Sequence, residues 1–255
     1  MKNKLYLCEI GDIYDNQIRL PYSTGLVWSY CKTFKEITDN YELLDWLFWR
    51  EDINQMLSRI KNPDIVGFSH FVWNEQINND LAKKVKNKYP NCLIIYGGQS
   101  TPKQDRCQDF FKIHPYIDVL IHGEGEITFK KLLDGYLNND IDSVSGCTFK
   151  QENNITKTNL SRPRIQDISI MPSPYLDGTF DNLAKKSPYK LDAIIETARG
   201  CPYSCTFCEW GDGYYTLLKR QPIEKLKKEI DWAVKYKVEF LYNADNNFGL
   251  FPEHK

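Results

Sequence analysis

Short apolar runs alternate with amphipathic stretches along the first half of the chain. Five runs rich in β-branched and aromatic residues predict strands at 5–10, 41–48, 64–71, 92–97 and 118–122. Apolar residues that recur every three or four positions predict helices at 53–60, 77–85 and 129–137, with weaker patterns near 22–35 and 104–113. The strands at 93–96 and 119–121 are apolar on both faces, which indicates that helices cover both sides of their sheet.

Five strands alternating with five helices predict an α/β fold with a doubly wound parallel sheet of flavodoxin-like type. Ligands of such sheets bind at the carboxyl ends of the strands. Those ends carry Gly11-Asp12, Ser69-His70, Gly97-Gly98 and Gly123-Glu124-Gly125-Glu126. The glycines either let a ligand approach the backbone closely or serve only tight turns between strand and helix, and the pattern leaves both interpretations open.

The second half changes character after a predicted hairpin at 145–159. An extended connection with three prolines follows at about 160–177, and a new strand begins at 191–197. A loop rich in cysteine comes next, then a helix and a strand at 238–242. The helix is expected to bury Leu226, Ile230, Ala233 and Val234. We therefore predict three parts: a first domain at 1–142, a hairpin and linker at 143–188, and a second unit at 189–255.

The composition is that of a globular protein and gives little sign of a charged partner. Of the 255 residues 42% are hydrophobic and 26% charged, which excludes global disorder, and the formal net charge of −1 offers no general attraction for nucleic acid or an anionic membrane. No apolar run reaches the ~18 residues that span a bilayer. The first residues do not resemble a signal peptide, so we expect a cytoplasmic protein.

The eight cysteines fall into two groups. Five are scattered and are expected to be small buried hydrophobes: Cys8, Cys31, Cys92, Cys107 and Cys147. Cys201, Cys205 and Cys208 form a Cys-x3-Cys-x2-Cys loop, close enough in sequence to ligate one metal centre. The spacing favours an iron–sulfur cluster with one iron left open. A zinc site, for which no histidine lies nearby in sequence, and inert cysteines or a disulfide with a spare thiol remain alternatives.

The cysteine loop and the strand ends together resemble one family. Residues 196–211, ETARGCPYSCTFCEWG, resemble the signature of radical SAM enzymes in the subgroup with an amino-terminal cobalamin-binding domain. The first half resembles that domain at 65–69 (IVGFS), 95–98 (IYGG) and 119–126 (VLIHGEGE), in the same order. The resemblance thus covers nearly the whole chain.

The resemblance implies a [4Fe-4S] cluster held by the three cysteines of the loop. Its open iron would bind the amino and carboxylate groups of S-adenosylmethionine, and one electron would cleave the sulfonium to give a 5′-deoxyadenosyl radical. The backbone of Phe207 would meet the adenine. Asp245 and Asn246 stand where the family contacts the methionine amino group, although the Gly-Gly-Glu often found there is absent.

The resemblance also implies cobalamin in the first domain, bound by five residues, of which the first four would line its nucleotide tail. These are Ser69, Gly97, Gly98, Gly123 and Glu124. The Asp-x-His-x-x-Gly motif of histidine-ligated cobalamin proteins is absent, so no histidine is expected as its lower ligand. His70 is expected to be a packed residue at a strand end.

Two function hypotheses follow from the resemblance. The first is an enzyme that transfers a methyl group to an unactivated carbon, with a flavodoxin or ferredoxin as reductant. The second is a non-catalytic module that binds cobalamin or a cluster. Residues 189–255 suffice for only two β/α units of a partial barrel, so we expect either a fragment or a second chain that completes the barrel.

Overall fold

A computed structural model describes residues 1–151, 156–208 and 218–251. The chain forms two compact units. Unit 1 comprises Met1–Ile13 and Ser23–Arg164, and unit 2 comprises Tyr14–Tyr22 and Ile165–Lys255. These units differ from the predicted division at residues 142 and 188, because the hairpin joins the first unit and a short early segment joins the second.

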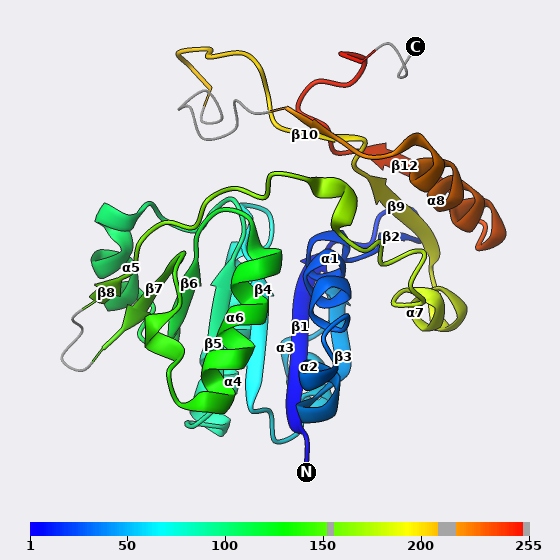
Figure 1. The fold of residues 1–255 in the computed structure, drawn as a ribbon. Helices are drawn as coiled ribbons and strands as arrows, with labels where there is room; N and C mark the ends of the chain where they lie inside the picture. The colour runs from blue at the N-terminus through cyan, green and yellow to red at the C-terminus, as the bar shows by residue number, and fades with distance from the viewer. Residues whose placement is uncertain (152–155, 209–217, 252–255) are drawn as a thin grey trace. The chain divides into compact units, whose positions relative to one another are not determined.

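Unit 1 is built on a seven-stranded sheet with the order β3-β1-β4-β5-β6-β7-β8 (Figure 1). Its first five strands are parallel. They are β1 (Asn3–Gly11), β3 (Tyr41–Trp49), β4 (Ile65–Ser69), β5 (Leu93–Gly97) and β6 (Val119–Ile121). Numbered along the chain, these five have the order 2-1-3-4-5, which is that of flavodoxin-like folds. The predicted fold class is confirmed.

Helices cover both faces of this sheet. They are α1 (Tyr22–Cys31), α2 (Lys35–Asn40), α3 (Ile53–Arg59), α4 (Glu75–Lys88), α5 (Cys107–Ile113) and α6 (Gly125–Asn138), with 3₁₀ turns η1 (Gln104–Arg106) and η2 (Ile141–Ser143). On one face, Leu81 and Val85 of α4 share a fully buried core with Val66 and Tyr96 of the strands. All five predicted helical stretches are confirmed, and the clearly amphipathic helices α4 and α6 bury their apolar stripes.

The predicted hairpin forms and extends the sheet of unit 1. β7 (Cys147–Lys150) runs antiparallel to β6 on one side and to β8 (Thr156–Thr158) on the other. The predicted turn at 152–154 lies outside the described residues. The hairpin is therefore part of the first sheet rather than of a linker.

Unit 2 contains a parallel three-stranded sheet with the order β12-β9-β2. Its strands are β2 (Gln17–Arg19), β9 (Lys190–Ile195) and β12 (Phe240–Asn243), and α8 (Ile223–Lys235) lies between β9 and β12 in sequence. The order strand, loop, helix, strand is thus confirmed. β2 was not predicted, since three residues are too few to show an alternating pattern. A 3₁₀ turn η4 (Ile168–Ile170) and a short helix α7 (Asp181–Lys186) precede β9.

The buried side of α8 differs from the predicted one. Leu226 and Ala233 are buried as expected, but Ile230 is 44% exposed and Val234 is 73% exposed. Trp232 is buried in their place because its ring packs 4.9 Å from that of Tyr175 and its indole N–H donates to Asp181 at 2.9 Å. Periodicity alone could not tell that a tryptophan and a buried Glu229 belong to the packed side.

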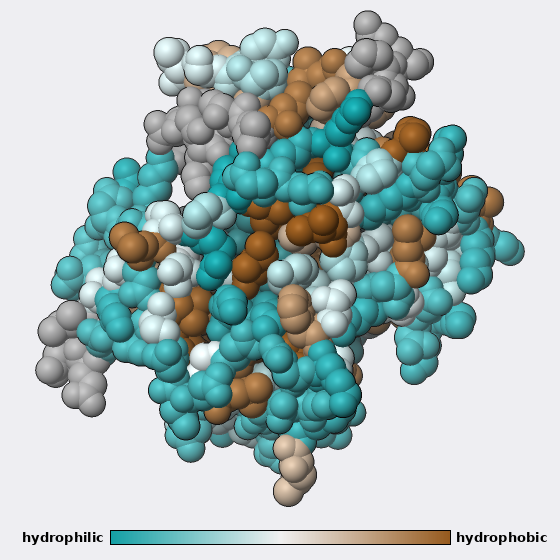
Figure 2. All heavy atoms as spheres, viewed as in Figure 1, coloured by the Kyte–Doolittle hydropathy of each residue, from teal (hydrophilic) through white to brown (hydrophobic). Residues whose placement is uncertain are grey.

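The face drawn in Figure 2 is mainly hydrophilic, with apolar groups scattered among polar ones. Within the described ranges, no helix is both long and apolar enough to span a bilayer.

Candidate functional site

The cysteine loop, residues 199–208, follows shortly after β9, the central strand of the sheet in unit 2. A small antiparallel pair, β10 (Ala198–Arg199) and β11 (Lys219–Arg220), pairs Arg199 with Lys219, so the chain on the two sides of the segment that contains the cysteine loop is held together. The N–H of Gln221 also donates to the carbonyl of Thr197 at 2.9 Å. Gly200 follows with a φ of 111°, which a residue with a side chain rarely adopts. The strand pair thus anchors the start of the cysteine loop, and Gly200 turns the chain sharply just before Cys201.

The three cysteines of the loop are accessible and unpaired. Cys205 is exposed, Cys201 and Cys208 are half-buried, and none of them is in a disulfide. The N–H of Cys208 donates to the carbonyl of Cys205 at 3.1 Å. In the part of the chain that the structure describes, no three Cys, His, Asp or Glu side chains lie close enough to hold a metal ion. The donor set therefore suits a thiolate-bound centre by its chemistry and accessibility, while the sulfur atoms are not gathered around one point.

The five scattered cysteines are all buried, as predicted. Burial disfavours the charged thiolate and raises the pKa of each thiol, to about 12 for Cys92 and Cys147. Because the thiolate is the form that binds metals, these five are poor ligands at neutral pH. The contrast separates the loop cysteines from the rest by environment as well as by spacing.

Asp245, one of the two predicted contacts to the methionine amino group, ties the end of β12 to the end of β9. Its carboxylate accepts hydrogen bonds from the N–H of Thr197 at 2.7 Å and from the N–H of Ala198 at 2.9 Å. It also accepts one from the hydroxyl of Thr197. These contacts give Asp245 a structural role at the start of the cysteine loop.

The loop after β12 reaches the cysteine loop through a residue that the sequence analysis did not select. The side-chain amide of Asn247 donates to the sulfur of Cys201 at 2.9 Å. Its neighbour Asn246 is exposed, and Phe207 is 91% exposed on the cysteine loop. The only sequence signal for Asn247 is its place in a polar run at the end of a strand, which also suits an ordinary turn.

A buried ion pair supports the base of the cysteine loop. The guanidinium of Arg199 donates twice to the carboxylate of Glu196, at 2.8 Å each, and both side chains are nearly buried. Lys225 and Glu229 of α8 interact electrostatically with this pair, and burial lowers the pKa of Lys225 and raises that of Glu229. A bidentate arginine pair fixes orientation as well as charge, so it holds the backbone that leads into Cys201.

In unit 1, the five residues predicted to contact cobalamin lie at the carboxyl edge of β4, β5 and β6. Ser69 and Gly97 are paired in the parallel register and Gly98 follows directly. Gly123 and Glu124 follow the end of β6, and Glu124 is the N-cap residue of α6, with a carboxylate oxygen 3.7 Å from the guanidinium of Arg164. The fold thus brings together the strand ends that the sequence placed far apart.

Ser69 belongs to a hydrogen-bond network at this edge. Its hydroxyl lies 2.9 Å from that of Ser23, which donates to the carboxylate of Glu9 at 2.7 Å. Glu9 also accepts from the N–H and hydroxyl of Thr24 in the first turn of α1. Burial raises the pKa of Glu9, and these hydrogen bonds oppose that rise. The network links the ends of β1 and β4 to the start of α1.

Gly97 and Gly98, at the end of β5 and just after it, have different reasons to be glycine. Gly98 has a φ of 119°, and a Cβ atom there would meet the carbonyl oxygen of His70 at 2.6 Å. The fold alone therefore requires glycine at 98. A Cβ on Gly97 would meet Ile121 at an ordinary 3.5 Å. Chain packing therefore does not require glycine at 97, and this position keeps backbone open at the strand end.

His70 is packed, as expected for a histidine at a strand end. It is 1% exposed, and its ring lies 5.2 Å from that of Tyr96 and 5.8 Å from that of Phe110. Neither ring nitrogen has a hydrogen-bond partner among the described residues. Burial lowers the pKa of His70, which favours a neutral ring.

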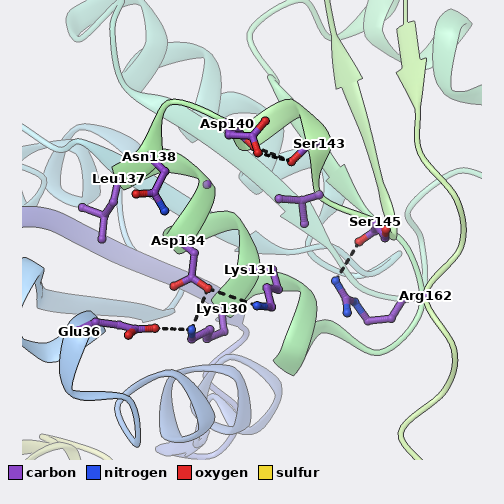
Figure 3. A pocket seen from close by; sticks show the side chains of 12 residues that line it. Glu36, Lys130, Lys131, Asp134, Leu137, Asn138, Asp140, Ser143, Ser145 and Arg162 are labelled. Carbon is purple, nitrogen blue, oxygen red and sulfur yellow. Dashed lines mark hydrogen bonds and ion pairs between the residues drawn. The ribbon is translucent and has the colours of Figure 1, made fainter.

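A polar pocket of about 650 Å³ lies along α6 in unit 1 (Figure 3). None of the predicted site residues lines it. Lys130, its most buried cation, contacts Glu36 at 2.6 Å and Asp134 at 2.7 Å, as the close view shows. The acidic partners neutralise the lysine, so the pocket presents no concentrated charge to a ligand.

Comparisons with known proteins place the chain in one family. No family model matches the chain. It is 36% identical over 240 residues to the cobalamin-dependent radical SAM methyltransferase TokK of Streptomyces tokunonensis, a match over 91% of this chain and 34% of that protein. It is 35% identical, with the same coverage, to 2-(S-pantetheinyl)-carbapenam-3-carboxylate methyltransferase of Streptantibioticus cattleyicolor. The chain thus spans about a third of the length of these curated relatives.

Solved structures show the same fold. The cobalamin-dependent S-adenosylmethionine radical enzyme OxsB, solved with aqua-cobalamin and S-adenosylmethionine, matches 99% of this chain with a TM-score of 0.74 and 22% identity, over 35% of its own length. The radical S-adenosylmethionine methyltransferase TsrM of Kitasatospora setae, solved with cobalamin and a [4Fe-4S] cluster, matches 100% of this chain and 49% of its own, with a TM-score of 0.69 and 13% identity. With this fold, this cysteine loop and these relatives, the chain belongs to the family of cobalamin-dependent radical SAM enzymes.

Proposed function

We propose that the protein acts as a cobalamin-dependent radical SAM methyltransferase whose methyl acceptor is an unactivated carbon. The observation that carries the proposal is the contrast among the cysteines. Three free, accessible thiols share one loop at the end of a parallel strand, while five others are buried with raised pKa values. The two relatives identical at 35–36% are both named methyltransferases.

In this proposal Cys201, Cys205 and Cys208 hold the cluster, and the loop after β12 lies beside them. When bound, the [4Fe-4S] cluster, S-adenosylmethionine and cobalamin supply electron transfer, radical formation and methyl carriage. The chain positions them. Asp245 fixes the start of the cysteine loop through Thr197 and Ala198, while the exposed Phe207 and Asn246 are free to meet the nucleoside and the amino group.

Cobalamin is assigned to the carboxyl edge of unit 1. Gly97 supports this assignment because packing within the chain leaves room for a side chain there, yet the residue is glycine. Gly98 and Gly123, both with positive φ, make the turns around it, and Ser69 and Glu124 supply polar groups at the same edge. His70 is packed between aromatic rings, so it is not assigned as the lower ligand.

The proposal includes a cytoplasmic location and a small electron-transfer protein of the flavodoxin or ferredoxin type. Eight unpaired cysteines suit a reducing compartment. An exposed cysteine loop also gives an external reductant access to the cluster, as electron transfer requires.

Anaerobic reconstitution of the intact protein with iron and sulfide tests the cluster. The wild type is expected to bind iron and sulfide in equal amounts and to cleave S-adenosylmethionine when reduced. Cys201→Ala, Cys205→Ala and Cys208→Ala should each lose the cluster, whereas the buried control Cys147→Ala should retain it. Tightly bound zinc in place of iron, or a cluster that survives these loop variants, would contradict the proposal.

Cobalamin binding needs a separate test, because the two cofactors are assigned to different units. Gly97→Ala adds a methyl group that the chain itself can accommodate. We expect it to weaken cobalamin retention, measured by visible absorption after gel filtration, without changing the iron content. A wild-type protein that retains no cobalamin would leave the radical SAM part of the proposal standing and remove the cobalamin part.

A further inference from the structure

The three loop cysteines differ in their hydrogen bonding. The sulfur of Cys201 accepts the side-chain N–H of Asn247 at 2.9 Å, and both residues are half-buried. Among the described residues, neither Cys205 nor Cys208 receives a side-chain hydrogen bond. One corner of the predicted ligand set is thus singled out by a neutral donor from another loop.

Three contacts hold the backbone just before this donor. Asp245, two residues earlier, binds the backbone of Thr197 and Ala198 and so joins the β12 loop to the start of the cysteine loop. The N–H of Ala244 continues the strand pairing by donating to the carbonyl of Ile195 at 2.9 Å. The N–H of Asp245 in turn donates to the side chain of Asn243 at 2.8 Å. The backbone that leads to Asn247 is therefore held beside the start of the cysteine loop by contacts that do not involve the sulfur.

We propose that Asn247 is a positioning residue that raises the reduction potential of the iron–sulfur cluster through its N–H···S hydrogen bond to Cys201. The inference rests on the proposed function, since it needs a cluster on this loop. Reduction transfers one electron from the external reductant to the cluster, and no bond forms or breaks in that step. The added negative charge falls partly on the sulfur ligands, so an N–H donor stabilises the reduced state more than the oxidised one.

Redox titration of the reconstituted intact protein, followed by electron paramagnetic resonance of the reduced cluster, tests this role. Asn247→Ala removes the donor, and Asn247→Leu removes it while filling a similar space. Both variants should shift the midpoint potential to more negative values. We expect the equilibrium constant for reduction to fall about tenfold, which corresponds to ~59 mV for a one-electron couple. Asn87→Ala is the control, because this exposed asparagine of α4 makes no hydrogen bond to a cysteine sulfur in the described residues and is assigned to no cofactor.

The outcomes separate this inference from the proposed function. A wild type without a cluster contradicts the proposed function itself. A wild type with a cluster and unchanged potentials in both Asn247 variants overturns the inference alone. A shift in Asn247→Ala but not in Asn247→Leu also overturns it, because solvent access rather than the hydrogen bond would then set the potential. Loss of the cluster in both variants, with Asn87→Ala normal, assigns Asn247 to loop folding and overturns the tuning role.

Discussion

Replacing Asp245 by alanine tests the bridge between the ends of β9 and β12. The carboxylate accepts hydrogen bonds from the backbone N–H groups of Thr197 and Ala198 at 2.7 and 2.9 Å, across 48 and 47 positions of sequence. Both residues are buried, so water cannot readily replace the lost acceptor. The alanine variant should therefore loosen the start of the cysteine loop.

The size of the effect follows from the hydrogen bonds that are lost. A hydrogen bond to a charged acceptor contributes roughly 1.5–3 kcal/mol. Taking about 2 kcal/mol for each amide, the free energy of local opening at Thr197 and Ala198 should fall by that amount, which is a factor of about 30 in the opening equilibrium. Each amide loses one hydrogen bond, so this factor applies to the opening of each amide taken by itself.

Native-state hydrogen exchange measures this directly, because it reports the opening of individual amides rather than global unfolding. The amides of Thr197 and Ala198 should exchange about 30 times faster in Asp245→Ala than in the wild type. Asp245→Asn keeps one carbonyl oxygen to accept both N–H groups and should stay within a few-fold of the wild type. Unchanged exchange in the alanine variant, or equal acceleration in both variants, would refute the assignment of the bridge to this carboxylate.

Three further predictions concern two glycines, one histidine and the cysteines. Gly98→Ala should lower the free energy of unfolding of unit 1 by more than about 2 kcal/mol, because of the positive φ and the contact of a Cβ atom with His70. Gly97→Ala should change that free energy by no more than about 1 kcal/mol. Thermal unfolding of the two variants measures the difference. Burial lowers the pKa of His122 to about 4, so below about pH 6.5 the unfolded chain binds a proton that the folded chain does not. Stability should therefore fall by roughly 3 kcal/mol from pH 6.5 to 4, and His122→Gln should flatten this part of the pH profile; equal slopes would contradict it. In the cluster-free protein, iodoacetamide followed by mass spectrometry should modify Cys205 and its two loop neighbours before any buried cysteine, and early labelling of Cys92 would count against the fold.

The parallel sheet of unit 1 could be predicted because its strands are buried on both faces. Runs such as 93–96 and 119–121 are apolar at every position, and each is followed by a glycine turn and an amphipathic helix. Those local signals determine which segments become strands, and the rules for strand–helix–strand connections then leave few possible orders. The same reasoning failed for β2, whose three residues carry no periodic signal.

The orientation of α8 could not be predicted from the spacing of its apolar residues. Ile230 and Val234 share an apolar stripe with Leu226, yet the helix turns Trp232 and Glu229 inward. The choice depends on partners distant in sequence, since Trp232 contacts Tyr175 and Asp181. A window of neighbouring residues contains no information about those partners.

By itself the sequence determined the chemistry that is available: three cysteines within eight positions and glycines at the strand ends. Only the tertiary structure decided what surrounds them. It buried the five other thiols, required glycine at 98 but not at 97, and brought Asn247 to Cys201 across 46 positions. The physical reason is that ligand spacing is a property of the local chain, whereas burial and hydrogen-bond partners arise only when distant strands pair side by side.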